Sequence, residues 1–131
     1  MSSFTKPLTV TKVNKRKWKI ERSFTYFIGD ENSDGEIKVP KGFITDFASI
    51  PRVFWTILPP DGKYTQAAVL HDFLYYKKGK LTNMKLSRKE CDGVFLEAME
   101  VLSVSWIKRH TIYRAVRMFG WLPFKRIIKL D

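Results

Sequence analysis

The stretch Thr65-Gln66-Ala67-Ala68-Val69-Leu70-His71-Asp72-Phe73-Leu74-Tyr75-Tyr76 decides the fold. Its hydrophobic residues recur every three or four positions, which is the period of an α-helix. Before the turn sequence at 59–62, hydrophobic residues instead fall on alternate positions, which is the period of a β-strand. The chain is therefore predicted to have an α+β fold that changes from strands to helices at about residue 60.

The N-terminal third is predicted to form a small antiparallel β-sheet over about residues 8–47. Alternating hydrophobic residues run through 8–13 and 18–28, and these two runs are expected to pair. Gly, Asp, Asn and Ser residues at 29–35 predict a turn, which a short strand at 36–39 follows. A further turn is expected at 40–42. Ser49 is expected to cap a short helix.

Three helices are predicted to follow, and the sheet is expected to pack against them. The first covers about residues 65–76. Ser87 and Glu90 form a capping-box sequence that opens the second helix, which continues to about Val101. The third covers about 105–119. Its buried face is expected to contain Ile107, Ile112, Tyr113 and Val116.

The length and composition are those of one soluble globular domain spanning residues 1–131. The chain has 44% hydrophobic and 28% charged residues, unlike a disordered segment. No membrane span and no signal peptide are expected, because the sequence lacks the apolar runs that both require. A single cysteine, Cys91, excludes an internal disulfide and a thiolate metal site.

Positive charge gathers at both ends of the chain, within a net charge of +11. Residues 1–22 hold seven Lys and Arg against one Glu, and residues 105–131 hold seven against one Asp. Such ends suit an anionic partner such as nucleic acid, although basic residues on a solvated face give the same pattern. The candidate anion-binding residues are Lys15, Arg16, Lys17, Lys19, Lys108, Arg109, Arg114 and Arg117.

Polar residues within apolar sequence are the candidates for a chemical site. Asp46 lies among aromatic and aliphatic residues, and so does the pair His71-Asp72. A carboxylate near a core requires a partner or a metal ion. The candidate catalytic residues are Asp46, Ser49, His71 and Asp72. The candidate supporting residues are Arg52, Tyr75, Arg88 and Asp92.

Two interpretations of this polar set remain open. In the structural one, the residues form a satisfied polar core, with His71 donating to a carboxylate and Arg88 pairing with Asp92 one helical turn away. In the functional one, His71 is a general base held by a carboxylate, or a divalent cation such as magnesium or manganese is held by Asp46, His71 and Asp72. A zinc site is disfavoured because no His-Glu-x-x-His motif is present.

Two strings resemble a small family of bacteriophage and prophage proteins of unknown function. They are Phe43-Ile44-Thr45-Asp46-Phe47-Ala48-Ser49-Ile50-Pro51-Arg52 and Ala67-Ala68-Val69-Leu70-His71-Asp72-Phe73-Leu74-Tyr75. The match extends over about residues 40–120 and includes Ser87, Arg88 and Asp92. The resemblance implies a phage-encoded protein in the host cytoplasm or the virion, and it specifies no reaction.

Two classes of function follow from these observations. One is a hydrolase-like enzyme, metal-dependent or not, acting on a host polymer such as peptidoglycan or on a phosphoester. The other is a non-catalytic virion or tail-assembly component, whose basic ends bind phage structural proteins with acidic surfaces or nucleic acid. The polar set favours the first class and leaves the second open.

Overall fold

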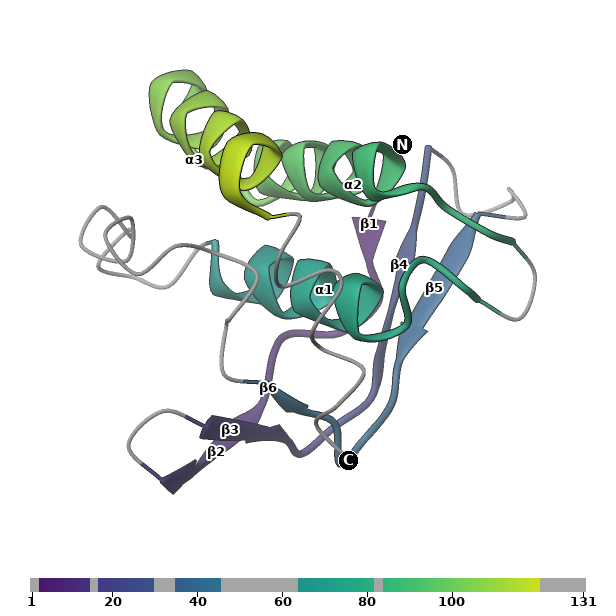
Figure 1. Ribbon diagram of the computed structural model, residues 1–131. Helices are drawn as coiled ribbons and strands as arrows, with labels where there is room; N and C mark the ends of the chain where they lie inside the picture. Colours follow the sequence, from purple (N-terminus) through teal and green to yellow (C-terminus); the bar gives the residue numbers. More distant parts are fainter. Residues whose placement is uncertain (1–2, 15–16, 30–34, 46–63, 82–83, 121–131) are drawn as a thin grey trace. The chain divides into compact units, whose positions relative to one another are not determined.

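The computed structural model describes residues 3–14, 17–29, 35–45, 64–81 and 84–120. It has antiparallel sheets in the N-terminal part and three helices in the C-terminal part, so the predicted α+β class is confirmed (Figure 1). The chain divides into two compact units, Met1–Asp46 and Phe47–Asp131. Packing of the sheet on the helices as one domain stays a prediction.

The N-terminal unit contains two three-stranded antiparallel sheets where a single sheet was expected. One has the order β1-β4-β5 and the other β2-β3-β6. The run at 8–13 does pair with the start of the run at 18–28, but a bend at 21–22 divides that second run between the two sheets. The strands are β1 (Ser3–Phe4), β2 (Val10–Asn14), β3 (Lys17–Ile20), β4 (Phe24–Phe27), β5 (Glu36–Val39) and β6 (Ile44–Thr45).

Alternating burial fixes the register of the β4–β5 pair. Phe24 lies opposite Val39 and Tyr26 lies opposite Ile37, and all four side chains are buried. A one-residue slip would expose all of them, because successive side chains of a strand point to opposite faces. The predicted turn at 40–42 is present. Its Gly42 has φ +93°, a conformation that favours glycine.

The helices of the C-terminal unit begin and end within one residue of their predicted bounds. They are α1 (Thr65–Tyr76), α2 (Arg88–Val101) and α3 (Trp106–Phe119), and α2 packs against both α1 and α3 (Figure 1). The predicted capping box opens α2, with Glu90 N–H donating to Ser87 Oγ and Ser87 N–H donating to Glu90 Oε1. None of the helices in the described ranges is long and apolar enough to cross a membrane.

The helices differ in which faces they bury. Every residue of α1 from 66 to 75 is buried, as expected for a helix that is apolar on most sides. The prediction that α3 buries Ile107 is wrong, because that side chain is 74% exposed. Ile112 and Val116 are buried as predicted, together with Ala115, whereas Tyr113 is half-buried. Ile107 lies on the opposite side of α3. The short helix expected after Ser49 lies outside the described residues.

Candidate functional site

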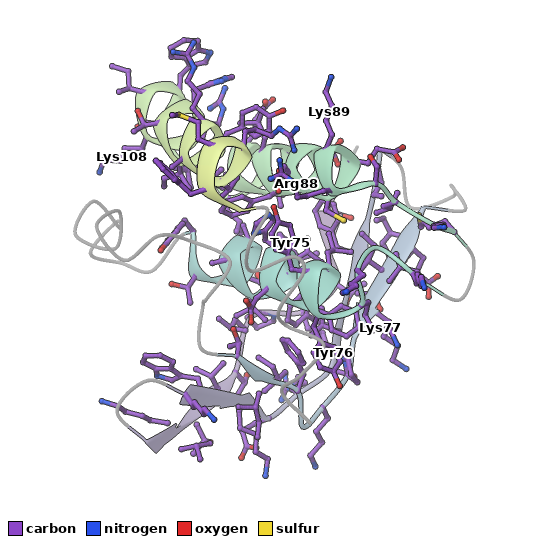
Figure 2. All side chains as sticks on the ribbon, viewed as in Figure 1. Tyr75, Tyr76, Lys77, Arg88, Lys89 and Lys108 are labelled. Carbon is purple, nitrogen blue, oxygen red and sulfur yellow. The ribbon has the colours of Figure 1, made fainter. Side chains whose placement is uncertain are left out.

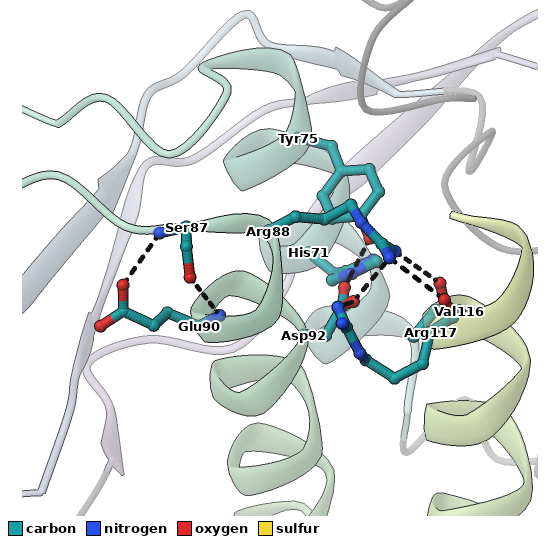
Figure 3. Close-up of polar contacts among 8 residues, drawn as sticks. All are labelled: His71, Tyr75, Ser87, Arg88, Glu90, Asp92, Val116 and Arg117. Carbon is teal, nitrogen blue, oxygen red and sulfur yellow. Dashed lines mark hydrogen bonds and ion pairs between the residues drawn. The ribbon is translucent and has the colours of Figure 1, made fainter. Parts of the chain in front are cut away.

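The carboxylate of Asp92 is the centre of a polar cluster between the helices. Helix α1 presents His71 and Tyr75 one turn apart, so both side chains point from the same face of α1 toward α2. His71 Nε2 lies 2.7 Å from Asp92 Oδ1, and Tyr75 Oη donates to the same oxygen at 2.5 Å (Figure 3). Asp92 and His71 are both fully buried. Oδ1 therefore has two side-chain partners from α1.

The second oxygen of Asp92 is bound by two arginines. Arg117 Nη1 of α3 lies 2.7 Å from Oδ2, and Arg88 Nη1 of α2 lies 3.4 Å from it. Arg88 also donates to the carbonyl oxygens of Val116 and Arg117 at 3.1 and 3.2 Å, which satisfies acceptors at the C-terminal end of α3 (Figure 3). This Asp92 cluster, consisting of His71, Tyr75, Arg88, Asp92 and Arg117, joins all three helices.

Close packing surrounds the cluster. The His71 ring stacks on Phe95 with a centroid distance of 4.5 Å and an interplanar angle of 24°. A Cβ atom at Gly120 would lie 2.6 Å from Tyr75 Oη and 3.2 Å from Arg88 Nη1, and it would also meet the Val116 carbonyl oxygen. Only glycine therefore fits at residue 120 without displacing the cluster.

The protonation states of the pair follow from burial and partners. Burial lowers the pKa of His71 below its usual value and outweighs the opposing effect of Asp92, so the imidazole is neutral at pH 7. Burial raises the pKa of Asp92, but hydrogen bonds from His71, Tyr75 and Arg117 outweigh burial and hold the pKa below its usual value. The pair is therefore a neutral imidazole donating to a carboxylate.

This state also fixes the tautomer of His71. A neutral imidazole carries one N–H, and the carboxylate at Nε2 requires the proton there. The lone pair of the neutral imidazole is then on Nδ1. Burial and the neighbouring Asp92 carboxylate hold the pKa of Tyr75 well above its usual value, so its hydroxyl stays a donor. The Asp92 carboxylate at Nε2 thus fixes the orientation of the His71 ring.

The predicted catalytic residues are only partly covered by the described ranges. Asp46 and Ser49 lie outside them, as does the supporting residue Arg52, so the grouping of Asp46 with His71 and Asp72 around a cation stays a prediction. Asp72 is buried, with 2% exposure, and follows His71 on α1. Within the described ranges, no group of three His, Cys, Asp or Glu side chains could hold a metal ion.

The supporting residues Tyr75, Arg88 and Asp92 are brought together with His71. The pairing of Arg88 with Asp92, expected from their spacing, is present. Arg117 was predicted only as an anion-binding residue, and its contact with Asp92 was missed. No local signal could have found it, because the two residues are 25 positions apart. The contact between Tyr75 and Asp92 did have a signal in the sequence, since Tyr75 lies one helical turn after His71 and therefore on the same face of α1.

The candidate anion-binding residues differ in their surroundings. Lys17 and Lys19 are exposed on β3, and Lys19 Nζ lies 3.8 Å from Glu21 Oε1. Arg109 pairs with Glu100, at 3.7 Å. Lys108 and Arg114 are exposed on α3. Lys15 and Arg16 lie outside the described residues.

Fold and cluster together define an α+β protein in which one buried carboxylate connects a histidine, a tyrosine and two arginines from three helices. The chain belongs to the DUF1353 family, described as protein of unknown function, whose sequence profile matches residues 18–116. A family of unknown function is what the sequence resemblance implied.

One curated relative is an uncharacterized protein, y4jT, of Sinorhizobium fredii (strain NBRC 101917 / NGR234). It is 32% identical to this chain over 84 residues, which cover 63% of the chain and 23% of the relative. The matched region is thus about a quarter of that longer protein. No solved structure matches the chain.

Proposed function

We propose that the chain is a phage-encoded hydrolase in which His71, held by Asp92, activates a water molecule. The observation that carries the proposal is the buried contact of 2.7 Å between His71 Nε2 and Asp92 Oδ1. It orients the imidazole, and we assign the role of the base to the other ring nitrogen, Nδ1. The phage origin is supported by the resemblance of residues 43–52 and 67–75 to phage and prophage proteins.

The reaction that suits one such base is hydrolysis of a carboxylic ester by direct attack of water. Nδ1 of His71 takes a proton from water as the water oxygen forms a bond to the carbonyl carbon, and the C=O electron pair moves to the carbonyl oxygen. When that pair returns, the C–O bond to the leaving group breaks. The leaving alkoxide takes the proton from the imidazolium, which gives an acid, an alcohol and neutral His71.

The other cluster residues position the base. Asp92 stabilises the imidazolium that forms during the attack, as a carboxylate does behind a catalytic histidine. Tyr75 and Arg117 hold one oxygen each of that carboxylate at 2.5 and 2.7 Å, which prevents the carboxylate from rotating. Neither residue is required to touch the substrate, so both are positioning residues.

A divalent cation remains part of the proposal, with Asp46, His71 and Asp72 as the predicted ligands. Bound there, the cation would polarise the carbonyl oxygen of the substrate. Because Nδ1 of His71 cannot bind a cation and accept a proton at once, the general-base role leaves Asp46 and Asp72 as the ligands.

The test is hydrolysis of three probes by the full chain: short-chain p-nitrophenyl esters, bis-p-nitrophenyl phosphate and purified peptidoglycan. Wild-type and His110→Gln should hydrolyse the ester, whereas His71→Gln should be slower by about 100-fold or more. His110 is the matched control because it is the other of the two histidines. Equal rates for both variants, or no hydrolysis of any probe, would overturn the proposal.

A second candidate, a non-catalytic virion or tail-assembly component, is favoured by the saturation of Asp92. Both carboxylate oxygens have two side-chain partners each, and His71 and Asp92 have no exposed surface. In that case the cluster stabilises the fold, and the basic ends bind acidic protein neighbours or nucleic acid.

The two candidates differ in what His71→Ala and Asp46→Asn do to folding. A catalytic site tolerates both changes with loss of activity, because active-site polar groups are held at some cost to stability. A purely structural cluster loses about 1–3 kcal/mol or more per unsatisfied partner, so His71→Ala should unfold at lower temperature, and Asp46→Asn should do so if Asp46 is part of the cluster. Thermal unfolding followed by circular dichroism measures the difference.

A further inference from the structure

Large hydrophobic side chains are exposed along α3. Half of the exposed large hydrophobic side chains in the described ranges belong to this helix. They are Trp106, Ile107, Met118 and Phe119, with exposed fractions of 61, 74, 66 and 53%. Isolated exposed hydrophobic residues are common, but a concentration on one helix marks a binding surface.

The same helix is basic and contains no acidic residue. Two of its cations are engaged within the unit, since Arg109 pairs with Glu100 and Arg117 with Asp92. Lys108 and Arg114 are exposed and form no ion pair with any side chain in the described part of the chain. Figure 2 shows Lys108 on α3, away from the labelled residues Tyr75 and Arg88 of the cluster region.

Helical spacing places three of these residues on one side of α3. Ile107, Arg114 and Met118 stand at positions i, i+7 and i+11, which share a stripe about 16 Å long. Trp106 flanks the stripe and packs on His110 with a centroid distance of 4.3 Å. The buried residues Ile112 and Val116 occupy the opposite side, and Ala115 lies between the two sides. The α3 face is therefore amphipathic, with an apolar and cationic outer side.

We infer that the α3 face, consisting of the stripe Ile107, Arg114 and Met118 and the exposed residues Trp106, Lys108 and Phe119 that flank it at the two ends of α3, docks on the surface of an anionic phospholipid bilayer. Helices that lie in a membrane interface combine apolar side chains with Lys and Arg in this way. Trp suits the headgroup level, the aliphatic side chains enter the acyl boundary, and the two cations meet lipid phosphates.

The balance of side chains favours lipid over nucleic acid. Nucleic-acid interfaces are polar and strongly cationic, whereas this face has four large hydrophobic side chains against two cations that form no ion pair within the described ranges. Ile107 and Met118 are the most exposed of the four and cannot stack on bases as an aromatic ring does. Both gain free energy by leaving water for an acyl environment.

Docking on a bilayer also indicates a substrate class, and this part of the inference rests on the proposed function. Met118 and Phe119 follow Arg117, whose guanidinium binds Asp92 Oδ2. Docking would bring the chain to a surface rich in carboxylic esters, although His71 and Asp92 are buried on the inner side of α3. A chain docked through α3 would act on the carboxylic ester of a phospholipid, releasing a fatty acid and a lysophospholipid.

The binding test is flotation of the full chain with vesicles in 0.1 M salt. The chain should float with vesicles of equal phosphatidylglycerol and phosphatidylcholine. Ile107→Ser/Met118→Ser should bind at least about tenfold more weakly, because two apolar side chains are lost. Val10→Ser/Val13→Ser is the matched control, since it removes two exposed apolar side chains from β2, and it should bind as wild-type does.

Three results would overturn the docking: no flotation of the wild-type chain, equal binding by both double variants, or binding to an oligonucleotide but not to vesicles. Mass spectrometry of the vesicles then separates the two proposals. Flotation without release of lysophospholipid supports the docking and contradicts the lipid substrate. Hydrolysis of soluble esters by a chain that does not float leaves the proposed function standing and overturns the docking.

Discussion

The Nε2 atom of His71 on α1 lies 2.7 Å from the Oδ1 atom of Asp92 on α2, and neither side chain has exposed surface. Burial keeps the imidazole neutral, while hydrogen bonds from His71, Tyr75 and Arg117 keep the carboxylate ionised. The pair therefore couples the stability of the helices to pH.

Acid should destabilise the chain in two steps. The pKa of His71 is lowered on folding, so the unfolded chain takes up a proton near pH 6.5 that the folded chain resists. Stability is full above pH 6.5 and falls below it by at most about 1.4 kcal/mol per pH unit. The pKa of Asp92 is also lowered, so its contribution is lost below about pH 4.

Urea unfolding between pH 8 and pH 4 measures this dependence. His71→Gln should abolish the loss between pH 6.5 and 5, whereas His110→Gln should keep it. If the free energy of unfolding of His71→Gln fell with pH as steeply as that of the wild-type chain, another titrating group would be responsible for the loss of stability.

Removing the Tyr75 hydroxyl should destabilise the protein. Tyr75→Phe deletes a hydrogen bond to a buried carboxylate, at a cost of about 1.5–3 kcal/mol. Tyr76→Phe is the matched control, because the neighbouring side chain is 37% exposed and should change stability by less than about 0.5 kcal/mol. Chemical denaturation compares the two, and equal effects would contradict the importance of the contact.

Two glycines should respond in opposite directions to alanine. Gly120→Ala places a Cβ atom 2.6 Å from Tyr75 Oη and should destabilise the chain by about 1–3 kcal/mol. Gly93→Ala meets no atom within 4 Å on α2 and should stabilise it by about 0.5–1 kcal/mol. Melting curves of both variants test the close packing around the cluster. If Gly120→Ala left the melting temperature unchanged, the close packing would be disproved.

A divalent cation bound by Asp46 and Asp72 should raise the melting temperature. At a concentration of 100 times Kd, one bound ion adds about 2.7 kcal/mol of stability. Calcium, magnesium, manganese and zinc are tested in turn by calorimetry. The rise should disappear in Asp46→Asn and Asp72→Asn and persist in Glu36→Gln, which removes an exposed carboxylate from β5. If none of the four cations raises the melting temperature, the cation is removed from the proposal.

The parts of the structure that depend on neighbouring residues were predictable from the sequence. Ser87 and Glu90 define the start of α2 because a capping box needs only four consecutive residues. The bounds of α1 followed from its helical period in the same way. Arg88 and Asp92 were correctly paired because they stand one turn apart on α2.

The parts that depend on distant residues were not predictable. The contact between Arg117 and Asp92 depends on how α3 packs on α2, which a helical period does not specify. The burial of Ile107 was wrongly predicted. The helical period of the hydrophobic residues allows two possible buried faces near the start of α3, and the packing of α3 on its neighbours determines which of them is buried. The division into two sheets arose likewise from a bend that hydrophobic alternation does not reveal.

The Asp92 cluster also bears on how long the folded chain persists. Its contacts join residues 17, 21, 25 and 28 positions apart, so we expect them to form late, after the helices have docked. Interactions absent from the folding transition state slow unfolding and leave the folding rate almost unchanged. The contacts of the Asp92 carboxylate should therefore slow unfolding, and so protect the native state against proteases, with little effect on the folding rate.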